Sequence, residues 1–114
     1  MSTSREAFVT EPPERQLGAL AASLARLSSS ARSAARVGII VPMLTECIQF
    51  IEWTAWHVSP EIAAELVDLQ IMLGIWRKAW PEASLNNTQR ILLSFQARKW
   101  SDQVLDYSGL LVTH

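Results

Sequence analysis

Few side chains in this sequence could ligate a metal ion or take part in catalysis, and four of these candidates lie in one segment of the chain. Glu46 and Cys47 are adjacent, and His57 precedes Glu61 by four residues. They offer oxygen, sulfur and nitrogen donors, but their spacing matches no ligand pattern in which donors share a helix face or a tight loop. We therefore expect no metal site and no cofactor. We interpret His57 as a residue near a helix C-terminus, where the helix dipole favours an imidazole.

Nucleophilic and acid–base catalysis also lack a convincing set of residues. Cys47 falls on the apolar side of a predicted helix, where a free cysteine behaves as a small hydrophobe. The other histidine of the chain is His114, the last residue, so no second histidine is placed to orient a base. Glu61 and Glu65 fall on a helix flank, where solvated charge is the simpler interpretation. We expect no catalytic residues and no enzymatic activity.

Two basic pairs, Arg77-Lys78 and Arg98-Lys99, leave an alternative open. If the fold brought such cations together, the chain could be a small all-helical enzyme or a ligand-binding domain, with a Trp-lined pocket and Arg/Lys contacts to an anion. The four glycines are isolated, so the sequence contains no Gly-rich phosphate loop. The net charge of −1 argues against nucleic acid as a partner, because domains that bind it usually carry a basic excess.

The elements that must position these residues fit one small domain. The chain has 114 residues, of which 49% are hydrophobic and 18% charged, a globular composition. Its single cysteine cannot form an internal disulfide, which favours a reducing compartment. A membrane span needs about 20 mostly apolar residues, and charges or Pro42 interrupt the two most hydrophobic runs. Because the N-terminus has no secretory pattern, we expect a cytoplasmic protein without a membrane span.

Helical spacing predicts an all-α fold, a small antiparallel bundle of about four helices. An extended N-terminal tail covers residues 1–14, because Pro12-Pro13 favour an extended backbone. A single helical-bundle domain covers residues 15–114. Its first helix carries an apolar stripe that ends near Ala31, with alanine and serine on both sides. Such small residues would let another helix approach closely.

The other helices are bounded by proline, glycine and capping residues. The second helix is expected from about Pro42 to His57, and residues 37–41 before it are either helical or a short extended piece. The third begins with Ser59 as its cap and ends at Pro81. The fourth begins after a cap formed by Asn86 and Gln89 and ends near Gly109. Tryptophans 76, 80 and 100 lie on the main apolar stripes and are assigned to the core.

A second set of apolar residues falls opposite the main stripes. On helical wheels, Trp53 and Trp56 project away from the core face of the second helix, and the third and fourth helices each carry a second apolar strip. These residues form the predicted partner-binding site: Trp53, Trp56, Val67, Ile71, Ile75, Ile91 and Phe95. We expect Ile75 and Phe95 to share one patch across the hairpin of the last two helices.

The function that follows is a non-enzymatic protein–protein interaction module: a regulator, adaptor, assembly factor or accessory subunit. Its partner would be another protein, or a second copy in a homo-oligomer, because exposed apolar patches with tryptophan commonly mark association surfaces. A purely structural explanation stays open beside it, in which the first helix or the N-terminal tail, through Phe8 and Val9, folds over the second apolar face.

Overall fold

The protein is an antiparallel bundle of four long helices preceded by one short helix. The computed structural model describes the backbone of residues 4–111 and the side chains as far as Gly109. Within this part the helices are α1 (Arg5–Val9), α2 (Pro13–Ala31), α3 (Val37–Thr54), α4 (Pro60–Ala83) and α5 (Asn87–Leu111). Two short 3₁₀ helices, Ala34–Arg36 and Ala55–His57, lie at the two ends of α3. No strand occurs among the described residues, so the predicted all-α fold is confirmed.

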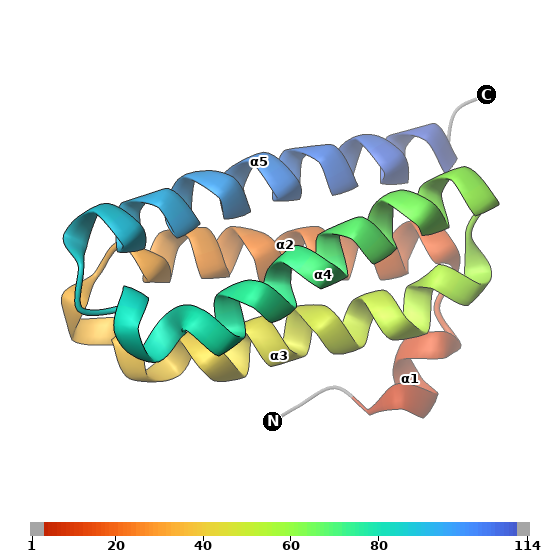
Figure 1. Cartoon of the computed structure of the whole chain (residues 1–114). Helices are drawn as coiled ribbons and strands as arrows, with labels where there is room; N and C mark the ends of the chain where they lie inside the picture. The colour runs from red at the N-terminus through yellow and green to blue at the C-terminus, as the bar shows by residue number, and fades with distance from the viewer. Residues whose placement is uncertain (1–3, 112–114) are drawn as a thin grey trace.

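The four long helices form a ring in which each runs antiparallel to its neighbours (Figure 1). α2 lies beside α5 and α3, and α4 completes the bundle between α3 and α5. The pairing of α2 with α5 is the closest in the molecule. The particle measures 44 × 26 × 20 Å. The short helix α1 lies at one end of the bundle, against α3 (Figure 1).

The core consists of the apolar stripes that helical spacing predicts. Leu17, Leu20, Leu24 and Leu27 on α2 are fully buried. The other helices contribute the buried residues Ile40, Leu44, Cys47, Phe50, Ile51, Leu66, Leu69, Leu73, Trp76, Trp80, Leu93, Ala97 and Val104.

The two buried tryptophans of α4 also find hydrogen-bond partners on neighbouring helices. The indole Nε1 of Trp76 donates to Gln96 Oε1 on α5 at 2.8 Å. That of Trp80 donates to the Val37 carbonyl at the start of α3 at 3.0 Å. Because a buried indole N–H without a partner is costly, these bonds help to fix α4 between α3 and α5.

The predicted extended tail is helical in part, which corrects that prediction. Ser4 caps α1 by accepting a hydrogen bond from the Ala7 amide at 3.2 Å. One helical turn places Phe8 against Phe50, and burial of this ring is the physical reason for the local helix. Pro12 is extended and separates α1 from α2, as expected for a residue before a proline. Residues 1–3 of the predicted tail and 112–114 of the predicted domain lie outside the described residues.

Three helix ends also differ from the prediction. α3 begins at Val37 and includes Pro42, so residues 37–41 are helical. Burial of Ile40 and the hydrogen bond to the Val37 carbonyl stabilise this extra turn. α4 continues past Pro81 to Ala83, and α5 continues through Gly109. The caps of α4 and α5 are confirmed: Ser59 Oγ accepts from Ile62 N and Asn86 Oδ1 accepts from Gln89 N.

The stretch Ala34–His57 has the length and the mean hydropathy, 1.5, of a helix that could cross a membrane. The core helix of a soluble bundle meets the same criteria. In this bundle 28% of the apolar window of the stretch is buried, with Ile40, Leu44 and Ile51 fully so. The absence of a membrane span stays a prediction.

Candidate protein-binding surface

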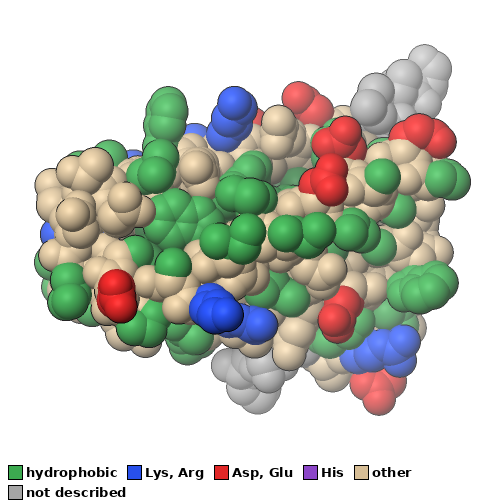
Figure 2. Space-filling view, in the orientation of Figure 1, with side chains coloured by type: hydrophobic (Ala, Val, Ile, Leu, Met, Phe, Trp, Pro, Cys, Tyr) green, Lys and Arg blue, Asp and Glu red, His purple; other side chains and the backbone are tan. Residues whose placement is uncertain are grey.

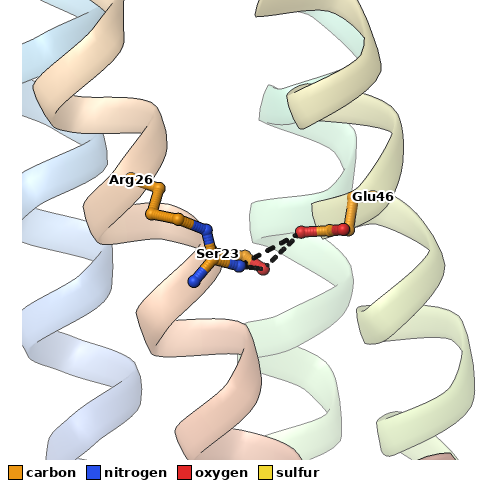
Figure 3. Close-up of polar contacts among 3 residues, drawn as sticks. All are labelled: Ser23, Arg26 and Glu46. Carbon is orange, nitrogen blue, oxygen red and sulfur yellow. Dashed lines mark hydrogen bonds and ion pairs between the residues drawn. The ribbon is translucent and has the colours of Figure 1, made fainter. Parts of the chain in front are cut away.

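Glu46, one of the two acidic residues considered above as metal donors, links two helices. Ser23 Oγ on α2 donates to Glu46 Oε1 on α3 at 2.7 Å (Figure 3). Arg26 Nη2 donates to Ser23 Oγ at 2.9 Å and lies 3.4 Å from the same Glu46 oxygen. The carboxylate therefore links α3 to α2. Among the described residues, no three His, Cys, Asp or Glu side chains come together as a metal site.

Cys47 is fully buried in the core beside this link. The pKa of its thiol is raised from 9.0 to about 12, mainly by burial and in addition by the neighbouring Glu46 charge, while Arg26 partly opposes the rise. A thiol that stays protonated and has no access to solvent is a poor nucleophile. Cys47 therefore acts as a small apolar residue of the core.

The two basic pairs face different neighbours. Arg77 Nη1 on α4 donates to Thr45 Oγ1 on α3 at 3.4 Å. Arg98 on α5 lies instead in a surface groove of about 340 Å³ between α2 and α5, together with Arg32. Ile91 and Phe95 line this groove. The groove thus combines cations with apolar walls, but its aromatic residue is a phenylalanine and not a tryptophan.

The outer side of α4 carries the most continuous part of the predicted partner-binding site. Val67, Ile71 and Ile75 recur every four residues and expose 43%, 57% and 56% of their surface. The opposite side of the same helix is core, with Leu66, Leu73 and other large residues buried. Since α3 and α5 occupy the two flanks of α4, no element of the described chain covers this strip. Figure 2 shows hydrophobic side chains in a row across this face, over α4.

Ile91 and Phe95 are exposed as well, and Phe95 leaves 74% of its surface open. They line the groove beside α2, with Ser28 and Ser94 at its base. Gln96, which faces α4 through its bond to Trp76, points to another side of α5. The groove lining places Phe95 beside Arg32 and Arg98, and the single patch of Ile75 and Phe95 across the hairpin stays a prediction.

Trp53 and Trp56 have different environments from each other. Trp53 is half-buried, and its ring centroid lies 5.2 Å from that of Phe8 on α1 and 5.8 Å from that of Phe50. Phe8 on α1 therefore covers part of Trp53, in line with the structural explanation through Phe8. Trp56 lies in the 3₁₀ helix at the end of α3 and is 87% exposed.

The seven predicted residues thus have different environments: a tryptophan partly covered by α1, an exposed tryptophan at the bundle end, the α4 strip and the groove beside α2. The prediction missed six further exposed apolar residues among the described ones: Ile39, Val41, Met72, Leu85, Leu92 and Leu105. Met72 and Leu92 each directly precede a leucine of a main apolar stripe, Leu73 and Leu93. On a helical wheel they therefore fall at the border of the predicted core face. Comparisons of the chain with known protein families, curated proteins and solved structures find no match.

Proposed function

We propose that this protein is a non-enzymatic interaction module that binds another protein chain through the outer face of α4. The observation that carries this proposal is the exposed strip of Val67, Ile71 and Ile75 on a helix whose other side is already packed. A helix that is apolar on two sides is normally covered on both. A binding partner would supply the second cover.

The energetic argument rests on the strip itself. Complete burial of such a side chain contributes roughly 1.5–3 kcal/mol relative to full exposure. The three strip residues are about half-exposed. Burial of their exposed surface in a complex would therefore contribute a substantial part of this free energy. An exposed apolar strip of this kind also favours aggregation unless it is covered. Both effects favour a protein partner, and the single cysteine favours a reducing compartment such as the cytoplasm.

Site-specific photo-crosslinking in the native host tests the proposal. A photoreactive phenylalanine analogue at Ile75 should give a discrete adduct, and mass spectrometry should identify a protein partner in it. When Ile71→Asp is added to the chain that carries the analogue, the adduct should be lost without unfolding, because Ile71 is not part of the core. The same analogue at Gln103, an exposed polar position on α5, is the matched control and should give no such adduct. The absence of an adduct at Ile75 would overturn the proposal.

A second candidate function comes from the groove between α2 and α5. Arg32 and Arg98 flank the apolar side chains of Ile91 and Phe95 there. This combination suits a small amphiphilic anion, such as a fatty acid, and corresponds to the ligand-binding alternative. Calorimetric titration with a medium-chain carboxylate should give saturable binding that Arg98→Ala weakens. Binding that Arg98→Ala leaves unchanged would exclude this site.

A further inference from the structure

We infer that the occupant of the α4 strip is a second copy of this chain, with the two α4 helices packed antiparallel about a two-fold axis at Ile71. This inference rests on the proposed function and names its partner. Two features of α4 support it: the seven-residue seam on its outer face and the separation of charge along the same face.

The seam consists of Ala64, Ile71 and Lys78, which are spaced by seven residues and all exposed. Residues at this spacing stay on one side of a helix when two helices cross at roughly 20°. A two-fold axis at Ile71 places Ile71 against its own copy. Val67 of one chain then lies opposite Ile75 of the other, so the three strip residues cover one another.

The ends of the seam are complementary in size. In the same register, Ala64 of one chain faces Lys78 of the other. An alanine leaves room for the aliphatic stem of a lysine, which packs on apolar surface while its ammonium stays in water. Gly74, one turn before Lys78, has nothing within 4 Å of the place that a Cβ would occupy, so the backbone there is open to close approach from outside.

The charges on α4 are separated along its length. Its first half carries Glu61, Glu65 and Asp68, and its second half carries Arg77 and Lys78 before Glu82 near the end. Antiparallel pairing brings the acidic half of each copy beside the basic pair of the other, whereas parallel pairing would bring like charges together. Glu82 would lie near the N-terminus of the other α4, where the helix dipole favours a carboxylate.

Asp68 and Lys78 are both exposed, and neither forms an ion pair within the described part of the chain. In the inferred dimer, the side chain of Lys78 extends over Ala64 of the second copy. Its ammonium then reaches Asp68, one turn further along that copy's α4. Each dimer contains this contact twice because of the two-fold axis.

A charge-swap experiment tests the partner and the register together. Sedimentation equilibrium should show the wild type as a dimer. Asp68→Lys and Lys78→Asp should each raise the dimer dissociation constant, by roughly tenfold for two weakened ion pairs. An equimolar mixture of the two variants should regain wild-type affinity as a heterodimer, because each chain then offers the charge that the other needs. The exposed Asp102→Lys variant on α5 is the matched control and should leave the dimer unchanged.

Disulfide trapping distinguishes antiparallel from parallel pairing. A Val67→Cys chain mixed with an Ile75→Cys chain should give a crosslinked heterodimer under mild oxidation, whereas neither variant alone should crosslink efficiently. The native Cys47 is buried, so it does not compete in the folded protein. Crosslinking of Val67→Cys with itself would overturn the antiparallel register.

The results also separate this inference from the proposed function. A monomer at all concentrations, together with an Ile75 adduct to a different protein in the host, would refute the self-association and leave the interaction function standing. A monomer with no adduct at Ile75 would refute both. A dimer that Ile71→Asp and the charge changes leave intact would place the dimer interface elsewhere and refute the inference.

Discussion

Ser28 on α2 and Ser94 on α5 exchange a reciprocal pair of hydrogen bonds. Each hydroxyl donates to the other residue's main-chain carbonyl, at 2.7 Å in both directions. Both side chains are buried. Such an exchange requires the two helix backbones to lie very close, which explains why α2 and α5 form the tightest pair in the bundle.

One-way bonds of the same kind, from a serine hydroxyl of α5 to a carbonyl of α2, follow along the two helices at intervals of seven residues. Ser101 Oγ donates to the Ala21 carbonyl at 2.8 Å, and Ser108 Oγ donates to the Glu14 carbonyl at 3.0 Å. Small buried residues near these positions, such as Ala21 and Ala97, permit the approach. The three serines of α5 form a ladder that sets the register of α5 against α2.

Removing one rung of this ladder should weaken the fold moderately. Ser101→Ala should lower the free energy of unfolding by about 1 kcal/mol, the usual net contribution of one hydrogen bond. Ser101→Leu should lower it further, because a large side chain forces the backbones apart. Urea denaturation followed by circular dichroism would measure both effects. Ser29→Ala, at an exposed position of α2, is the control. Equal stability of Ser101→Ala and Ser29→Ala would mean that the ladder contributes nothing.

Replacing a buried tryptophan should lower the free energy of unfolding much more than replacing an exposed one. Trp76→Ala should lower the free energy of unfolding by about 3–5 kcal/mol, because a large buried residue is lost and Gln96 loses its donor. Trp56→Ala should change it by less than about 0.5 kcal/mol, since surface substitutions rarely do more and this side chain is almost fully exposed. Thermal melts of the two variants at equal protein concentration would decide the matter. Similar losses for both would contradict the assignment of Trp56 to the surface.

The sequence predicted the parts of the fold that depend on repeated apolar spacing. The stripes from Leu66 to Trp80 and from Leu17 to Leu27 are the core, because burial of apolar area is additive and recurs with the helical period. The small residues of α2 correctly indicated a close neighbour. The polar side of that contact could not be predicted, because a serine that bonds a carbonyl on another helix has no local signature.

Only part of the candidate surface was predicted correctly, because the rest depends on contacts between residues that are distant in sequence. Val67, Ile71 and Ile75 lie on one helix, so their common face follows from helix geometry alone, and all three are exposed. The covering of Trp53 depends on Phe8, a residue distant in sequence. The place of Phe95 in the groove beside α2 depends on how α5 is rotated against α2, which the periodicity of a single helix does not determine.

The buried thiol should make the protein sensitive to alkaline pH. Because the pKa of Cys47 is raised to about 12 in the fold, the folded chain keeps a proton that the unfolded chain loses above pH 9.0. Stability that is complete below pH 9.0 should therefore decline as the pH rises toward 12. Cys47→Ala should show a shallower decline than the wild type in urea titrations over this range. Identical pH dependence in the two proteins would contradict the buried position of the thiol.

The same burial predicts slow chemical modification. At pH 8 a thiol-specific disulfide reagent should react with Cys47 only as fast as the chain opens, and urea should accelerate the reaction greatly. The variant Gln103→Cys, at an exposed position of α5 outside the inferred interface, should react at once and serves as the positive control. Rapid labelling of the native wild type at pH 8 would show that the α2–α3 side of the core is open.

The last prediction concerns the short helix α1 and the aromatic cluster beneath it. Phe8 stacks on Phe50 with ring centroids 4.6 Å apart and also covers Trp53. Phe8→Ala should release α1 and leave the four long helices folded, because α1 packs mainly on α3 at the edge of the bundle. Hydrogen exchange should then lose its protection at residues 5–9. The global loss of stability should be smaller than the roughly 3–5 kcal/mol expected for a large core residue.

Arg5→Ala, on the exposed side of the same helix, is the matched control and should leave the protection intact. Release of α1 also uncovers Phe50 and Trp53 on a face distinct from the α4 strip, so the two surfaces can be told apart. If Phe8→Ala exposes a second apolar face that promotes association, self-association should increase and should persist when Ile71→Asp is added. If Phe8→Ala unfolds the whole bundle, α1 is an integral part of the core and not a cover for the aromatic cluster.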